Sequence, residues 1–167
     1  RALGRRKSAL PTAADVGGCP CGGGGTVKLT IVAVGHKPPA WIAEGCAEYV
    51  KRMPRDLPLA VVEVRPEPRA GKNRQQLLAA EKERLQLALQ AYPRIVLLDE
   101  RGSDLTTRQL ADRLDVWRGA GGDTAFVIGG ADGVDPALKQ QAAETLRLSS
   151  LTLPHMLARL LVCEQLY

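Results

Sequence analysis

The chain has 167 residues, of which 45% are hydrophobic and 25% are charged. This size and composition suit one globular domain with a real core rather than two domains. The uninterrupted apolar stretches are short, and none approaches the roughly 20 residues that span a bilayer, so we expect no membrane insertion and a cytoplasmic protein. The four cysteines are too few and too scattered for a disulfide framework, which fits a reducing compartment.

The first segment, residues 1–26, shows no hydrophobic period and ends in a glycine tract. We expect it to be a disordered leader or an upstream extension; its Arg-rich composition also resembles a transit peptide. Cys19-Pro20-Cys21 lacks a second pair of ligands, so no metal site is expected there. The leader holds most of the net charge of +5. We therefore expect the folded domain to comprise residues 27–167.

From residue 27 onward, apolar strand patterns alternate with helical ones. Strands are predicted at 27–34, 59–64, 94–99, 124–129 and 146–150. Helices are predicted at 38–53, 73–92 and 106–117, and from Asp135-Pro136 and Pro154 onward. The second helix should bury one face, made of Leu78, Leu85, Leu89 and Tyr92. Nearly all-apolar strands alternating with helices predict a single α/β domain whose mainly parallel sheet is flanked by helices.

Ligands of such sheets bind beyond the carboxyl ends of the strands, where three loops are of interest: "LLDERG", "IGGADG" and "SSLTLPH". The loop "IGGADG" contains Gly129, Gly130 and Gly133, which would let a ligand approach bare main chain. A tight turn without a ligand is the alternative. The spacing does not match a dinucleotide-binding loop, and no phosphate-binding P-loop follows. Asp99 and Asp132 lack further carboxylates, so turn and capping roles are favoured over a metal site.

A histidine and a loop rich in cations could also take part in function. His155, at the start of the last helix, could be a general base or could simply hydrogen-bond the backbone. A basic loop provides a possible phosphate footprint, although a solvated loop explains the charges equally well. Its cations are Arg65, Arg69, Lys72 and Arg74.

Four stretches together resemble one enzyme family. They are "KLTIVAVGHKPPAWI", "RIVLLDERG", "FVIGGADG" and "LRLSSLTLPHMLARLLVCEQLY". In this order they are similar to the RlmH-type ribosomal large-subunit pseudouridine N3-methyltransferases of the SPOUT superfamily, over about residues 27–167. The resemblance implies a trefoil knot in the C-terminal part, a homodimer and S-adenosylmethionine as cofactor. An untangled path is the ordinary expectation for a chain of this kind.

The resemblance also implies site residues and a reaction. The methyl group would go to N3 of a pseudouridine in 23S rRNA on the assembled ribosome. His155 would assist loss of the N3 proton, and Arg159 would act beside it or contact phosphate or the backbone, while the basic loop would bind RNA. The cofactor would lie against Leu98, Gly129, Gly130, Gly133, Leu148, Ser149, Ser150, Leu151, Thr152 and Leu153.

The family continues past the position of Tyr167 with a segment rich in His, Tyr and Arg, so the C-terminal tail is expected to be truncated here. This departure leaves an alternative, an RNA-binding adaptor that binds cofactor but has impaired catalysis. A nucleotide-dependent oxidoreductase is a third hypothesis, from a different class.

Overall fold

The structure is a computed structural model that describes residues 26–167. The expected leader therefore lies outside the described residues except for Thr26, as do Cys19 and Cys21. No helix between residues 26 and 167 has both the length and the apolar character needed to cross a membrane.

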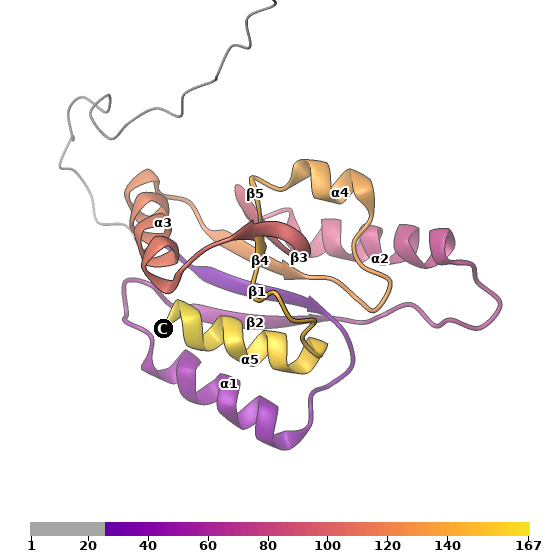
Figure 1. The fold of residues 1–167 in the computed structure, drawn as a ribbon, viewed down its shortest axis with the longest axis horizontal. Coiled ribbons are helices and arrows are strands. Elements are labelled where there is room, and N and C mark those ends of the chain that lie inside the picture. Colours follow the sequence, from indigo (N-terminus) through magenta and orange to yellow (C-terminus); the bar gives the residue numbers. More distant parts are fainter. Residues whose placement is uncertain (1–25) are drawn as a thin grey trace, which may run out of the picture.

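Five strands alternate with five helices in the described part of the chain. They are β1 (Leu29–Val34), α1 (Ala40–Arg52), β2 (Leu59–Val64), α2 (Arg74–Leu89), β3 (Arg94–Asp104), α3 (Thr107–Ala120), β4 (Thr124–Ile128), α4 (Pro136–Gln141), β5 (Glu144–Arg147) and α5 (His155–Leu166). The strands form one sheet in the order β2-β1-β4-β3-β5, and every neighbouring pair is parallel (Figure 1). The predicted single α/β domain with a parallel sheet is confirmed.

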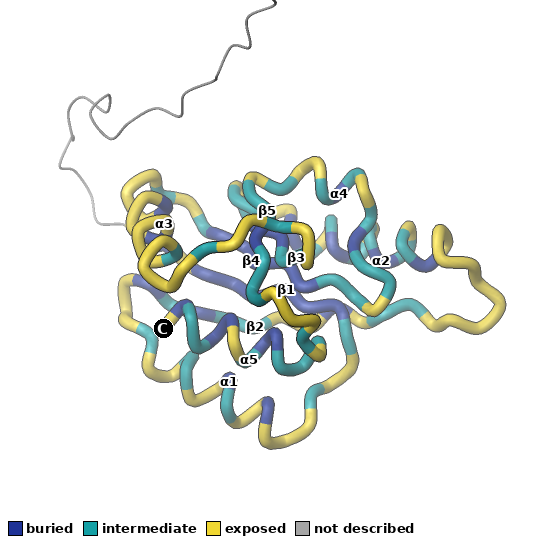
Figure 2. Tube along the Cα trace, in the orientation of Figure 1, coloured by how far each residue is buried: buried dark blue, intermediate teal, exposed yellow. Residues whose placement is uncertain are grey.

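Helices cover both faces of the sheet because the central strands are apolar on both sides. In β1, Leu29 and Ile31 belong to a core cluster shared with α1, α3 and α5. Val32 and Val34 point to the other face and pack in a cluster with α2 and α4. Figure 2 shows this buried sheet between more exposed helices. The period of two along each strand thus builds two separate cores.

Helices α1 and α5 lie side by side on one face of the sheet (Figure 1). Cys46 of α1 and Cys163 of α5 are both buried in this layer, as expected of small apolar side chains. Burial raises the pKa of the Cys163 thiol, and the neighbouring Cys46 adds to the effect. Both thiols are therefore packing groups.

The fifth strand and the buried face of the second helix differ from their predictions. The fifth strand is Glu144–Arg147 rather than 146–150, because β3 pairs with Glu144 to Leu146 along the edge of the sheet. In α2 the buried face holds Leu77 instead of Leu78, and a carboxylate, Glu81, lies on it. The α2 stripe therefore repeats every four residues through Leu85 and Leu89 and includes one charged side chain.

Strand β3 is longer than predicted and meets β5 twice. Leu98 pairs with Leu146, and after an irregular segment Ser103 pairs with the same Leu146. The side chain of Arg147 hydrogen-bonds Asp104 next to this second contact, with its Nε 2.6 Å from Oδ1. The end of β3 is thereby fixed against β5.

The connections explain where a cavity forms. After β1 and β3 the chain enters helices on the α5 face, whereas after β4 it enters α4 on the opposite face. In such a sheet, a crevice opens where the connections from two neighbouring strands lead to opposite faces. The segment after β5 starts at the edge of the sheet and must cross the carboxyl end of β3 to bring α5 beside α1.

Candidate functional site

A cavity of about 1100 Å³ lies at the carboxyl ends of the strands. Its wall combines the loops after β1, β2, β4 and β5 with residues 98–101 of β3. Of the predicted cofactor residues, all but Ser150 line it: Leu98, Gly129, Gly130, Gly133, Leu148, Ser149, Leu151, Thr152 and Leu153. Segments far apart in the sequence are therefore brought together at one cavity.

Different physical reasons favour glycine at the three positions of the loop after β4. A Cβ at Gly129 would stand 2.5 Å from Cγ2 of Val134, and one at Gly130 would stand 2.9 Å from Oε2 of Glu81. Gly133 has φ +88°, a conformation that favours glycine. A side chain at Gly129 would therefore collide first with its own turn.

His155 lines the cavity at the first position of α5. Its Nε2 lies 3.3 Å from Nη2 of Arg159, one turn further along the helix. Because a guanidinium is always a donor, this contact uses the lone pair of Nε2 and leaves the proton on Nδ1. Burial, and to a smaller degree the charge of Arg159, lowers the pKa of His155 from 6.5 to about 4. The ring is therefore neutral at pH 7 and a weak base.

Arg159 is buried, with only 1% of its surface exposed. Its Nη1 lies 3.1 Å from Oε1 of Glu63 in β2, while its Nε has no hydrogen-bond partner within the described residues. Gly35 leaves room for this pair, since a Cβ there would stand 2.7 Å from Arg159 Nη2 and 2.8 Å from His155 Nε2. The guanidinium of Arg159 is therefore covered by the fold rather than presented at the surface.

Three of the four predicted RNA-binding cations already have partners in the fold. Arg69 Nη2 lies 2.7 Å from Oδ2 of Asp132, and Arg74 Nη2 donates to the Asp132 carbonyl oxygen at 3.0 Å. Both contacts join the basic loop to the loop "IGGADG", residues 128–133, called the glycine loop below. Lys72 forms an ion pair with Glu67.

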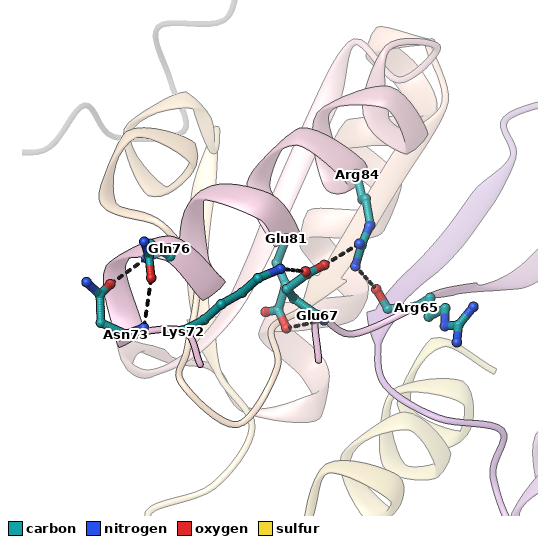
Figure 3. Close-up of polar contacts among 7 residues, drawn as sticks. All are labelled: Arg65, Glu67, Lys72, Asn73, Gln76, Glu81 and Arg84. Atoms are coloured by element: carbon teal, nitrogen blue, oxygen red, sulfur yellow. Dashed lines mark hydrogen bonds and ion pairs between the residues drawn. The ribbon is translucent and has the colours of Figure 1, made fainter. Parts of the chain in front are cut away.

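Arg65 differs from the other cations of the loop. Its carbonyl oxygen accepts a hydrogen bond from Arg84, which also pairs with Glu67. Its guanidinium makes no hydrogen bond within residues 26–167 and points away from this cluster (Figure 3). Arg65 is exposed and is one of the residues that line the cavity.

Asp99 and Asp132 take part in pairing rather than metal binding. Burial works against ionisation of Asp99, but hydrogen bonds from Lys139 and from the Arg101 N–H outweigh it and lower the pKa of this carboxyl. Asp132 is engaged by Arg69. Within the described residues no group of three or more His, Cys, Asp or Glu side chains could hold a metal ion.

Sequence reasoning missed Glu81, which also lines the cavity. Its side chain comes from the buried stripe of α2, and Oε1 accepts a hydrogen bond of 3.2 Å from the Glu67 N–H (Figure 3). The signal was its spacing of four residues from Leu77 and from Leu85, which puts a carboxylate in an apolar position.

Comparisons with known proteins identify relatives of the whole described domain. Residues 27–167 match the family described as "Predicted SPOUT methyltransferase". A protein of Dechloromonas aromatica named Ribosomal RNA large subunit methyltransferase H is 60% identical over 141 residues, which cover 84% of this chain and 90% of the relative. The protein of the same name from Burkholderia thailandensis is 56% identical over 142 residues, covering 84% and 91%.

A solved structure supports the fold alone. A putative methylase family protein from Neisseria gonorrhoeae superposes with a TM-score of 0.50 at 17% identity, covering 96% of this chain and 85% of that one. At this identity the likeness describes the path of the backbone rather than a reaction.

Proposed function

Because the chain belongs to the SPOUT methyltransferase family, we propose that it methylates N3 of a pseudouridine in 23S rRNA on the assembled ribosome. The single observation that carries this proposal is the shared cavity wall. Leu98, Gly129 and the segment 148–153 meet at the carboxyl ends of the strands, where the family resemblance places the cofactor. The names of the two relatives support a large-subunit rRNA substrate. Nothing in the described residues favours the adaptor or the oxidoreductase.

The cavity is large enough to hold S-adenosylmethionine. Its volume of about 1100 Å³ exceeds what one nucleoside with an amino-acid arm needs. Leu98, Leu148 and Leu153 would contact the cofactor, and main-chain groups near Gly129 and Thr152 would hydrogen-bond it. When bound, the cofactor supplies an electrophilic methyl group on a sulfonium. The task of the protein is then to bring the pseudouridine N3 into line with that methyl group.

Proton removal from N3 would fall to the histidine on the wall. We assign it to His155 in its neutral form, held in orientation by Arg159. A pKa of about 4 makes it a weak base, so its contribution should lie at or below the lower end of the roughly 100- to 10,000-fold typical of general bases. Arg159 would be a positioning residue, because it is buried behind His155.

RNA binding would use cations that remain available at the cavity mouth. Arg65 is the first candidate, whereas Arg69, Lys72 and Arg74 would mainly hold the loop in place and add to the positive field. A homodimer would cover exposed apolar side chains of α1 and α5. Among these, Trp41 is 59% exposed and Leu161 is 39% exposed. We place the protein in the cytoplasm, where ribosomes are found.

A trefoil knot is part of the same proposal. The double pairing of Leu146 with Leu98 and with Ser103 supports it, because β5 then lies between two parts of the β3 segment. The chain beyond Arg147 would pass through this loop before forming α5.

Labelled S-adenosylmethionine incubated with ribosomes that carry the pseudouridine but lack its methyl group tests the reaction. We expect label in 23S rRNA, recovered as N3-methylpseudouridine after nuclease digestion. Cofactor binding without label transfer would instead support the adaptor.

A further inference from the structure

Glu81 is a carboxylate in a position where a helix normally buries an apolar residue. It is 8% exposed and lies between Leu77 and Leu85 on the stripe of α2 that packs toward the sheet. Taking a carboxylate out of water costs free energy unless a cation or several hydrogen-bond donors replace the water. The fold must therefore give Glu81 a partner or keep it for a ligand.

The fold supplies Glu81 with little compensation. In the described part of the chain its only hydrogen bond is the one from the Glu67 N–H to Oε1, and no Lys or Arg lies within 4.0 Å. The other acids on the cavity wall each have a cation at that distance. These pairs are Glu67 with Lys72 and Arg84, Asp99 with Lys139, Glu100 with Arg101, and Asp132 with Arg69.

The carboxylate of Glu81 reaches the glycine loop. A Cβ at Gly130 would stand 2.9 Å from Oε2 and 3.4 Å from Oε1 of Glu81, and 3.3 Å from Cγ1 of Val34. The missing side chain at Gly130 thus leaves space for the carboxylate. Gly129 directly precedes Gly130. Oε2 therefore lies beside the main chain to which we assign cofactor binding.

We propose that Glu81 binds the α-ammonium group of the methionine part of S-adenosylmethionine; this inference rests on the function proposed above. An ammonium brings both the missing positive charge and three N–H donors to a carboxylate that lacks them. The sulfonium has no N–H to donate, and the ribose hydroxyls carry no charge. Glu81 would thus select ligands by their amino-acid end.

The test combines a change in one side chain with a change in one group of the ligand. Calorimetric titration measures the affinity of each combination. The protein variants are the parent chain, Glu81→Gln and Glu83→Gln. In the first variant the new amide oxygen can still accept the Glu67 N–H, and Glu83 is an exposed acid on the same helix that serves as the matched control. The ligands are S-adenosylhomocysteine, which keeps the ammonium but has no charge on sulfur, and its analogue without the α-amino group.

Glu81→Gln should bind S-adenosylhomocysteine about 10- to 100-fold more weakly than the parent, as expected for a lost charge-assisted hydrogen bond. The same change should alter the affinity for the deaminated analogue by less than about threefold, because that ligand has no ammonium to lose. Glu83→Gln should bind both ligands like the parent. The parent should also prefer S-adenosylhomocysteine to the analogue, a result that does not depend on how well any variant folds.

Several results would overturn the inference. Equal weakening of both ligands by Glu81→Gln would assign Glu81 to the ribose or to loop structure instead. A parent chain that binds both ligands equally would show that no carboxylate recognises the ammonium. Either result leaves the proposed function intact, whereas a parent chain that binds no adenosyl ligand would refute the function together with the inference.

Discussion

Gly102 lies directly against the backbone of Leu146. A Cβ at position 102 would stand 2.4 Å from the carbonyl carbon of Leu146 and 2.7 Å from its oxygen. Backbone cannot move aside as a flexible side chain can, so this close crossing of β3 and β5 requires glycine. The crossing also sets the wall of the cavity, since Leu148 follows two residues later.

Gly102→Ala should therefore destabilise the fold, by about 2 kcal/mol or more, as overpacking of a tight contact does. Urea unfolding followed by circular dichroism measures the change. Gly119→Ala is the matched control: position 119 lies within α3 and a Cβ there meets nothing within 4 Å. That substitution should be neutral or stabilise by up to about 1 kcal/mol. Equal stability of both variants would disprove the tight crossing.

His155 should make the stability of the protein depend on pH. The folded pKa is about 4, below the ordinary value of 6.5, so between these values the unfolded chain binds a proton that the folded protein does not. The contribution to the free energy of unfolding is fully present above pH 6.5 and is lost as the pH falls toward 4. His155→Gln removes this difference.

Urea titrations at about pH 7 and about pH 4.5 measure the effect. The parent should lose more stability between these two values than His155→Gln does. His36→Gln, which removes the other histidine of the chain, is the control and should follow the parent. Parallel losses in the parent and in His155→Gln would count against a buried neutral ring.

Arg159 should help to hold the pKa of His155 down. Arg159→Met removes the charge but keeps an apolar chain in the buried space, so the pKa of His155 should rise. It should stay below the ordinary range, because burial is the larger cause. Proton NMR can follow the titration, since the chain has two histidines. Arg159→Lys keeps the charge and should keep the low pKa; an unchanged titration in Arg159→Met would contradict the assigned contact.

Arg65 should contribute more to RNA binding than its neighbours. Arg65→Gln should weaken binding to ribosomal large subunits and lower the salt dependence by about one counterion. Lys72→Gln should have a smaller effect on affinity, because Lys72 is already paired with Glu67. Arg55→Gln is the control: Arg55 is exposed between α1 and β2, at the opposite end of the sheet. Equal losses for all three variants would indicate a diffuse positive field instead of a specific contact.

Much of the fold follows from local sequence patterns. Apolar strands such as 59–64 were predicted with the observed bounds, and the helices that Thr106 and Asp135 cap begin within a residue of the predicted positions. The fifth strand was misplaced because its position depends on pairing with β3, which local hydrophobicity does not contain. The second contact of β3, through Ser103, is likewise a tertiary feature.

The prediction of the candidate site rests on the family resemblance more than on local chemistry. The glycine loop was identified, but the reason for its bare residues was not, because Val134 folds back within the turn and Glu81 approaches from α2. Glu81 itself was missed, since a charged residue within a helix is normally solvent-exposed. The basic loop shows the same limit: counting charges locates Arg69 and Lys72 but does not reveal that both are paired.

The central claim is that the cavity at the carboxyl ends of the strands holds S-adenosylmethionine. A crystal structure of the protein grown with this compound tests it most directly. We expect the ligand against the main chain at Gly129 and along 148–153, with its ammonium group facing Glu81. A ligand bound outside this cavity, or a cavity that remains empty at saturating concentration, would contradict the claim.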